Sequence, residues 1–241
     1  MLNPYAMQAV VLAGGLATRM RPQTLAIPKA MLEVAGRPFV DWQLERLAQC
    51  GLRDVVLCIA YLGEQIRAHV GDGARHGVRV TWSEDGGKLL GTAGALREAL
   101  PALASTFLVT YGDSYLPFDY AEPLRTLEAH ADCDGVMAVY KNDGKWDASN
   151  VITDGLWVIR YEKGTRGDPA FDHIDYGATA LRRAVVEALP REAHGLDTLA
   201  RELAARKRLR ACVARERFFE IGSPEGLAEL DQKLRTGPSP R

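Results

Sequence analysis

The chain has 241 residues, of which 47% are hydrophobic and 25% are charged, and its formal net charge is −1. This composition is typical of a soluble globular protein and fits one large α/β domain, with or without a small appendage. The balanced charge argues against a nucleic-acid partner, and the lack of a long apolar run argues against a membrane span. No basic segment followed by an apolar stretch opens the sequence, so we expect no signal peptide and a cytoplasmic location.

The cysteines and histidines predict no zinc site. Four cysteines are scattered without the spacing of metal ligands, so we expect reduced and mostly buried thiols at Cys50, Cys58, Cys133 and Cys212. The five histidines form no His-x-x-x-His pair.

The first predicted element is a buried parallel strand at residues 9–13, which breaks at Gly14 and Gly15. Arg19 and Lys29 follow in a segment punctuated by prolines. A strand that opens into a glycine turn leaves bare backbone N–H groups at its carboxyl end, where ligands bind in open α/β sheets. Glycines let the backbone approach a phosphate closely, and Arg and Lys add positive charge. The segment therefore predicts a site for a nucleoside triphosphate.

Two common nucleotide motifs do not fit this segment, because it lacks both the third glycine of a Rossmann fingerprint and the Gly-Lys-Ser/Thr of a P-loop. It resembles instead the sugar-phosphate nucleotidyltransferases, whose pattern is roughly Gly-Gly-x-Gly/Ala-Thr-Arg-Leu/Met-x-Pro-x-Thr, a short spacer, then Pro-Lys-Ala/Pro-Leu/Met. The fitting positions are Gly14, Gly15, Ala17, Thr18, Arg19, Met20, Pro22, Thr24, Pro28, Lys29, Ala30 and Met31. The resemblance implies nucleotide contacts from Leu12, Ala13, Gly14, Gly15, Thr18 and Arg19.

Strand and helix signals alternate along the next hundred residues. Residues 31–34 are expected to be extended, and Gly51 is a natural left-handed end for the helix before it. We predict helices at 37–50, 64–70, 91–100 and 120–131, and strands at 55–60, 78–82, 106–111 and 135–140.

A second glycine-containing motif, Leu-Gly-Thr-Ala-Gly-Ala-Leu, spans residues 90–96. In the resembled family this segment lies against the base and ribose, which implies nucleotide contacts from Gly91, Thr92 and Gly94. The alternative is a helix start where small residues permit close packing. Residues 86–89, Gly-Gly-Lys-Leu, depart from the Glu-Pro-Leu-Gly of many relatives, so the base contacts stay open.

The strand at 106–111 ends in Tyr111, Gly112 and Asp113. A carboxylate at the carboxyl end of a central strand faces the ligand crevice, and Mg²⁺ in phosphate chemistry is held by one or two carboxylates plus phosphate oxygens. Asp113 is therefore the first predicted Mg²⁺ ligand. The Gly-Asp motif of the resembled family agrees with this assignment and places Tyr111 and Gly112 at the substrate.

The C-terminal half is predicted to bind the sugar. Residues 150–153 and 156–161 flank Asp-Gly at 154–155, a strong hairpin signal. The resemblance implies that Glu162 and Lys163 follow this hairpin as a substrate-binding pair, with the lysine on the sugar phosphate; the alternative is a solvated charge pair. Where many relatives carry Asn-Ala-Gly in the sugar pocket, this chain has Asp175, Tyr176 and Gly177.

The last segment supplies the second predicted metal ligand. Residues 182–189 and 197–206 are predicted helices, and the basic residues between 201 and 210 are interpreted as a solvated face. Residues 218–225 resemble the family's aromatic-x-Asp-x-Gly-Thr/Ser-Pro-Glu motif, with Glu220 at the metal-binding position. Ser223 is expected to cap the final helix.

Together these features predict a mostly parallel, Rossmann-like α/β sheet of the GT-A-like nucleotidyltransferase type, with flanking helices and a small β-rich sugar-binding part. We expect one domain over residues 1–235, with a nucleotide half at about 7–140, a sugar half at about 141–235, and a flexible tail at 236–241. The resemblance implies catalysis by Arg19, Lys29 and Asp113, with Mg²⁺ held by Asp113 and Glu220.

The predicted reaction is nucleotidyl transfer from an NTP to a sugar 1-phosphate with release of pyrophosphate. The resemblance is greatest to short bacterial guanylyltransferases acting on mannose- or heptose-type 1-phosphates for capsule or surface glycans, which favours GTP. A uridylyl- or thymidylyltransferase acting on an amino-sugar or glucose 1-phosphate, and a non-catalytic nucleotide-sugar sensor, stay as alternatives. A glycosyltransferase is disfavoured because Asp113 lies in Gly-Asp-Ser-Tyr and not in Asp-x-Asp. The sequence leaves the oligomeric state open, including a homo-oligomer.

Overall fold

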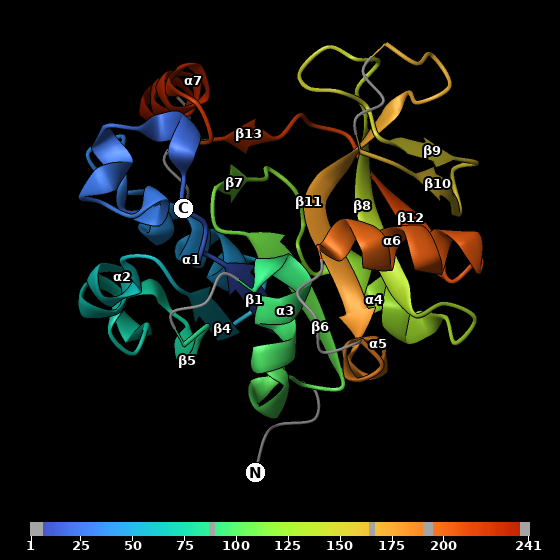
Figure 1. Cartoon of the computed structure of the whole chain (residues 1–241), viewed down its shortest axis with the longest axis horizontal. Coiled ribbons are helices and arrows are strands. Elements are labelled where there is room, and N and C mark those ends of the chain that lie inside the picture. Colours follow the sequence, from blue (N-terminus) through green and yellow to red (C-terminus); the bar gives the residue numbers. More distant parts are fainter. Residues whose placement is uncertain (1–6, 87–89, 164–166, 190–194, 237–241) are drawn as a thin grey trace.

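A nine-stranded mixed sheet with helices on both faces forms the protein (Figure 1). The computed structural model describes residues 7–86, 90–163, 167–189 and 195–236. Within them the strand order is β10-β9-β11-β6-β1-β4-β5, and β8 and β12 extend the sheet beside β11. The predicted fold class is thereby confirmed. Residues 87–89, just before the second motif, residues 164–166 and the predicted tail from 237 onward lie outside the described residues.

The N-terminal part (residues 7–134) is an all-parallel arrangement around β1. Its strands are β1 (Gln8–Leu12), β4 (Asp54–Ile59), β5 (Arg79–Glu84) and β6 (Thr106–Tyr111). Strand β1 lies between β4 and β6, and Leu12 is in register with Cys58 on one side and Tyr111 on the other. The carboxyl ends of three strands therefore meet at one edge of the sheet.

The side chains of β1 alternate between two cores. Ala9 and Val11 pack with the helices on one face, whereas Val10 packs with those on the other. The first face is covered by α1 (Phe39–Gln49), α2 (Gly63–Val70) and α4 (Glu122–Ala129), and the second by α3 (Gly91–Glu98), α5 (Arg183–Glu187) and α6 (Leu196–Ala205). Burial on both faces explains why this strand reads as a continuous apolar run.

The C-terminal part (residues 135–236) continues the same sheet with mainly antiparallel pairs, the exception being β12, which runs parallel to β8. Its strands are β8 (Gly135–Lys141), β9 (Val151–Thr153), β10 (Val158–Tyr161), β11 (His173–Arg182) and β12 (Leu209–Ala214). Strand β11 pairs antiparallel with β6 on one side and β8 on the other, so it joins the two parts. The predicted hairpin is present as the antiparallel pair β9–β10.

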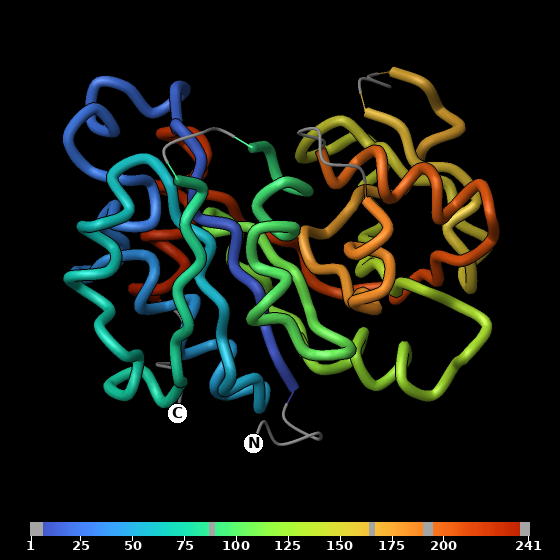
Figure 2. The backbone as a smooth tube through the Cα atoms, turned by 60° about the horizontal axis from the view of Figure 1, so that its bottom comes forward, coloured from blue at the N-terminus to red at the C-terminus, as the bar shows by residue number. Residues whose placement is uncertain are grey.

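The last segment returns from the C-terminal part to the N-terminal part, as both views show (Figures 1 and 2). It forms β13 (Phe219–Glu220), which pairs with β7 (Ser114–Tyr115), and then α7 (Pro224–Thr236), which packs beside β2 (Glu33–Val34). Ser223 caps this helix as predicted, because its Oγ atom accepts a hydrogen bond from the Gly226 N–H at 3.1 Å.

Three local predictions need correction. Helix α1 begins at Phe39 and not at Arg37, because residues 37–38 pair with β2 as the short strand β3 (Arg37–Pro38). Within residues 31–34 only β2 is a strand, since Lys29–Met31 forms a turn of 3₁₀ helix. The basic face is not simply solvated: Arg210 is mostly buried, pairs with Asp132 at 2.9 Å, and stacks against the ring of Trp157.

The thiols behave as predicted, since Cys58, Cys133 and Cys212 are buried, Cys50 is half-buried, and all four are free. Among the described residues, no helix is long and apolar enough to cross a membrane.

Candidate active site

The carboxyl ends of β1 and β6 open into a cavity of about 490 Å³. Six segments meet there: the loop after β1, the 3₁₀ turn that carries Lys29, the end of β4, the residue after β5, the start of α3, and the end of β6. The residues lining it are Leu12, Ala13, Gly14, Gly15, Leu16, Ala17, Thr18, Lys29, Ala30, Cys58, Asp85, Gly91, Thr92, Ala95, Tyr111, Gly112 and Asp113. Most of the predicted nucleotide contacts are thus brought together.

Two glycines allow the strand ends to approach one another closely. A Cβ atom on Gly112 would lie 2.9 Å from the Cα atom of Ala13, and one on Gly14 would lie 3.0 Å from the Cβ atom of Ala60. Contacts under about 3 Å between carbon atoms cost more than an ordinary packed core can absorb. Glycine at position 112 therefore lets the loop that carries Asp113 pack directly against the end of β1.

The two predicted cations lie in short 3₁₀ turns, and of the two only Lys29 is among the residues that line this cavity. Lys29 donates a hydrogen bond from Nζ to the Oδ2 atom of Asp113 at 2.8 Å. Arg19 lies in the turn Thr18–Met20, and its Nη2 atom would be 3.1 Å from a Cβ atom on Gly222. Because Gly222 follows β13, the guanidinium of Arg19 lies beside the segment that carries Glu220.

The two predicted metal ligands lie on adjoining segments: Glu220 is in β13, and Asp113 directly precedes β7. Glu220 is in register with Ser114 in the β7–β13 ladder, and the Ile221 N–H donates to the Asp113 carbonyl oxygen at 3.0 Å. Burial, followed by the nearby charges of Asp113 and Asp147, raises the pKa of Glu220 to about 7. Two adjacent oxygen donors suit Mg²⁺, which takes one or two carboxylates and completes its shell with water and phosphate oxygens. No described cluster offers three metal-ligating side chains.

The start of α3 forms the opposite wall. Gly91 and Thr92 line the cavity, whereas Gly94 lies further along the helix and is not among the lining residues. The Oγ1 atom of Thr92 accepts a hydrogen bond from the Leu196 N–H at 2.8 Å, which ties α3 to the first turn of α6.

Sequence reasoning missed Asp85, which lines the same cavity. Its Oδ1 atom is buried and finds no hydrogen-bond partner in the described part of the chain, and burial raises the pKa of its carboxyl group. A signal was available, because Asp85 directly follows β5 and so lies at the same carboxyl edge as the loops after β1 and β6.

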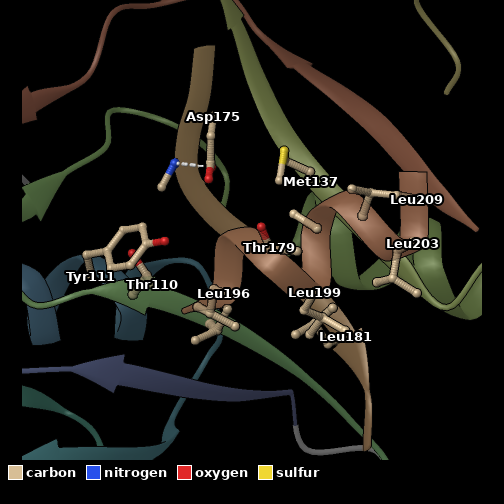
Figure 3. A pocket seen from close by; sticks show the side chains of 13 residues that line it. Thr110, Tyr111, Met137, Asp175, Thr179, Leu181, Leu196, Leu199, Leu203 and Leu209 are labelled. Carbon is tan, nitrogen blue, oxygen red and sulfur yellow. Dashed lines mark hydrogen bonds between the residues drawn. The ribbon is translucent and has the colours of Figure 1, made fainter. Parts of the chain in front are cut away.

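A second, narrow cavity lies on the C-terminal side, behind Tyr111 and Asp175 (Figure 3). The side chains of α6, among them Leu199 and Leu203, cover it. The Asp175 carboxylate accepts hydrogen bonds from the Gly177 N–H at 3.0 Å and from the Tyr161 hydroxyl at 3.4 Å. Burial raises the pKa of Asp175 above its usual value. Tyr111, Asp175 and Gly177 therefore line one cavity, and their role in substrate binding stays a prediction.

The structure does not bring every predicted substrate residue to these cavities. The side chain of Tyr176 lies in the opposite core against Phe118 and Phe218, and its hydroxyl donates to the Glu216 carbonyl oxygen at 2.8 Å. Neighbouring residues of a strand face opposite sides of a sheet, so Asp175 and Tyr176 cannot both point into one cavity.

The Glu162–Lys163 pair lies at the end of β10, and neither side chain lines either cavity. Glu162 forms an ion pair with Arg160, with 2.5 Å between Oε2 and Nη2. The Nζ atom of Lys163 lies 3.7 Å from the Oδ1 atom of Asp197, in the first turn of α6. The lysine side chain is 62% exposed, and its predicted contact with the sugar phosphate stays a prediction.

The predicted phosphate-binding loop, cations and carboxylates thus converge on one edge of the sheet. Residues 9–215 match the MobA-like NTP transferase domain. The chain belongs to this family. A Campylobacter jejuni D-glycero-α-D-manno-heptose 1-phosphate guanylyltransferase is 27% identical over 91% of this chain and 96% of its own length.

Two further family relatives match over a smaller share of their length. A Neisseria meningitidis N-acetylmuramate α-1-phosphate uridylyltransferase is 41% identical, over 50% of this chain. A Mycobacterium tuberculosis mannose-1-phosphate guanylyltransferase is 30% identical, over 77% of this chain. The aligned stretch spans 52% of each of these two relatives.

Among solved structures, HddC from Yersinia pseudotuberculosis, crystallised with GMP-PN, superposes with a TM-score of 0.78 at 26% identity, over 95% of this chain and 99% of its own. An Acinetobacter baumanii UDP-glucose pyrophosphorylase shares the fold alone, with a TM-score of 0.76 at 16% identity over 95% of this chain and 93% of its own. These similarities include guanylyl and uridylyl proteins, so base choice must be argued from the site.

Proposed function

We propose that this chain transfers a nucleotidyl group from a nucleoside triphosphate to a sugar 1-phosphate, giving an NDP-sugar and pyrophosphate. The observation that carries the proposal is the pairing of Lys29 with Asp113 in a glycine-lined cavity, with Glu220 and Arg19 on the adjoining segments. A sensor that only bound a nucleotide sugar would have no use for two nearby carboxylates beside two cations.

The reaction needs positioning and neutralisation of charge more than a protein nucleophile. An oxygen of the sugar phosphate attacks the α-phosphorus in line, and pyrophosphate leaves. Arg19 is assigned to the leaving pyrophosphate, because its planar guanidinium can hold two phosphate oxygens at once. Lys29 is assigned to the α-phosphate. Asp113 and Glu220 would hold Mg²⁺, which supplies charge neutralisation across the α-phosphate and pyrophosphate when bound.

GTP is the proposed nucleotide, and Asp85 supports this choice. Its unpartnered, buried oxygen lies in the nucleotide cavity and requires a hydrogen-bond donor. Guanine presents two adjacent donors, N1–H and N2–H₂, which a carboxylate can accept together. Uracil presents one N–H between two carbonyl oxygens, which would repel the second carboxylate oxygen. A site built around Asp85 should therefore discriminate strongly against UTP.

A manno-configured hexose or heptose 1-phosphate is the proposed acceptor, for capsule or other surface glycans. Support comes from the Campylobacter guanylyltransferase, since the alignment spans nearly the whole of both chains. One alternative has its own support: the Neisseria uridylyltransferase is more similar over half of this chain, which favours UTP with an amino-sugar 1-phosphate.

The test is a competition assay with equal GTP, UTP, dTTP, CTP and ATP, and with the 1-phosphates of mannose, heptose, glucose and N-acetylglucosamine. Preferred use of GTP with mannose or heptose 1-phosphate is expected. Preferred use of UTP with N-acetylglucosamine 1-phosphate would favour the alternative. Nucleotide binding without pyrophosphate release from any pair would support a sensor.

An Asp85→Asn variant should lose the preference for GTP over UTP if Asp85 contacts the base.

A further inference from the structure

Lys29 and Asp113 are bonded to each other in this structure, although the proposed reaction assigns them to different partners, the phosphates and the metal. The Nζ–Oδ2 distance is 2.8 Å, and the two side chains are only 18% and 25% exposed. A charge-assisted hydrogen bond in such a partly buried position is stronger than a typical surface ion pair.

We propose that Lys29 is a resident counter-ion of Asp113, which keeps divalent metal off this carboxylate until a nucleoside triphosphate binds. This inference rests on the proposed function, because it assumes that Asp113 is a metal ligand and that the cavity receives a triphosphate. It adds an order of events: metal enters with the nucleotide or after it, and not before.

The ammonium and a divalent cation compete for the same oxygen. Lys29 already donates to Oδ2 of Asp113, while Oδ1 has only a long contact of 3.5 Å with the Ser114 hydroxyl. A divalent ion on this carboxylate would lie within a few ångströms of the ammonium, where repulsion is large in a site partly screened from water. Lys29 must therefore leave before the metal can bind Asp113 at full strength.

The cavity offers Lys29 a new partner only when it is filled. The lysine lines the same cavity as Gly14, Gly15 and Thr18, where the triphosphate is proposed to lie. Phosphate oxygens there can replace Asp113 as acceptors for the ammonium, which frees the carboxylate for the metal. Without a triphosphate, metal binding at Asp113 leaves the partly buried ammonium of Lys29 unpaired. The free-energy cost of that unpaired charge lowers the affinity of Asp113 for the metal. Nucleotide and metal should consequently strengthen each other's binding.

The test measures Mn²⁺ binding to the nucleotide-free protein by the loss of the free-ion electron paramagnetic resonance signal. Lys29→Met should bind Mn²⁺ about tenfold more tightly than the unaltered protein, since the competing charge-assisted bond is gone. Lys29→Gln provides the same loss of charge if the methionine variant does not fold. Lys29→Arg, which keeps the cation, should bind Mn²⁺ as weakly as the unaltered protein. Lys207→Met removes an exposed lysine after α6 and should change nothing.

A double variant shows that the effect arises at Asp113. Adding Asp113→Asn to Lys29→Met should abolish the gain in Mn²⁺ affinity. An unchanged or weaker affinity in Lys29→Met and Lys29→Gln, or an equal gain in Lys29→Arg, would overturn the counter-ion role even if the enzyme forms product. Failure of the proposed function would show separately, as absence of a sugar nucleotide in the substrate panel.

Discussion

The two cavities, one proposed to bind the phosphates and the other to lie at the sugar end, are built differently. In the N-terminal part, the phosphate end depends on backbone: glycines at 14 and 112 let strand ends approach to distances that no side chain would permit. In the C-terminal part, the sugar end depends on side chains brought from distant segments, such as Asp175 with Tyr161 and Lys163 with Asp197. Close contacts between backbone segments restrict the residue type at those positions, whereas a pocket lined by side chains can be formed by many combinations of residues. The following predictions test this contrast, from the largest expected effect to the smallest.

The largest effect is expected at the phosphate end from Asp113→Asn. The change removes the negative charge of the carboxylate proposed to hold Mg²⁺, so turnover should fall by roughly 10³-fold or more. Steady-state pyrophosphate release, with circular dichroism to show that the protein is folded, checks this result. Near-normal turnover of a folded variant in Mg²⁺ would remove Asp113 from the mechanism.

Gly112→Ala tests the backbone approach itself. The added Cβ would lie 2.9 Å from the Ala13 Cα atom and 3.0 Å from the Leu12 carbonyl oxygen, so β1 and β6 must shift apart. We expect a loss of about 2 kcal/mol in the free energy of unfolding. Gly15→Ala is the matched control, since its Cβ would meet no atom within 4 Å. Urea denaturation should separate the two variants, and equal stabilities would contradict the steric role of Gly112.

The pH dependence of stability tests the carboxylate pair. Glu220 has a folded-state pKa of about 7, raised from 4.5 mainly by burial. Its charged form is disfavoured on folding, so the stability of the metal-free protein should fall as pH rises from about 4.5 through 7. Glu220→Gln should therefore raise the Tm by roughly 5 °C at pH 8.5 and hardly at all at pH 5. A Tm difference independent of pH would contradict the raised pKa.

The smallest effects are expected at the sugar end, where Asp175 and Tyr176 should differ although they are neighbours. Asp175→Asn should raise the KM for the sugar 1-phosphate by about tenfold and leave the KM for the nucleotide unchanged. Tyr176→Phe should cost about 1 kcal/mol of stability, because the Glu216 carbonyl loses its donor, and should leave both KM values unchanged. A raised KM for the sugar 1-phosphate in Tyr176→Phe would show that the hydroxyl of Tyr176 contributes to substrate binding.

Much of the fold was predictable because its signals are local. Strand β6 falls at the predicted residues 106–111, and the Asp-Gly turn correctly predicted the β9–β10 hairpin. Local signals fail where a partner distant in the sequence decides the structure. Arg210, for example, is drawn into the protein by Asp132 and Trp157, which local charge patterning cannot reveal.

By itself the sequence pointed to the proposed phosphate end, because Gly14 and Gly15 lie within three residues of the end of β1, and Gly112 and Asp113 directly follow β6. Only the tertiary structure decided which side chains line each of the two cavities. In β11, Asp175 points toward the narrow cavity behind Tyr111, whereas Tyr176 points into the opposite core. At the carboxyl end of β5, Asp85 lies beside the loop after β1. The physical reason is that strand register and sheet order are set by long-range pairing, which fixes the direction of each side chain after local preferences have fixed only the element.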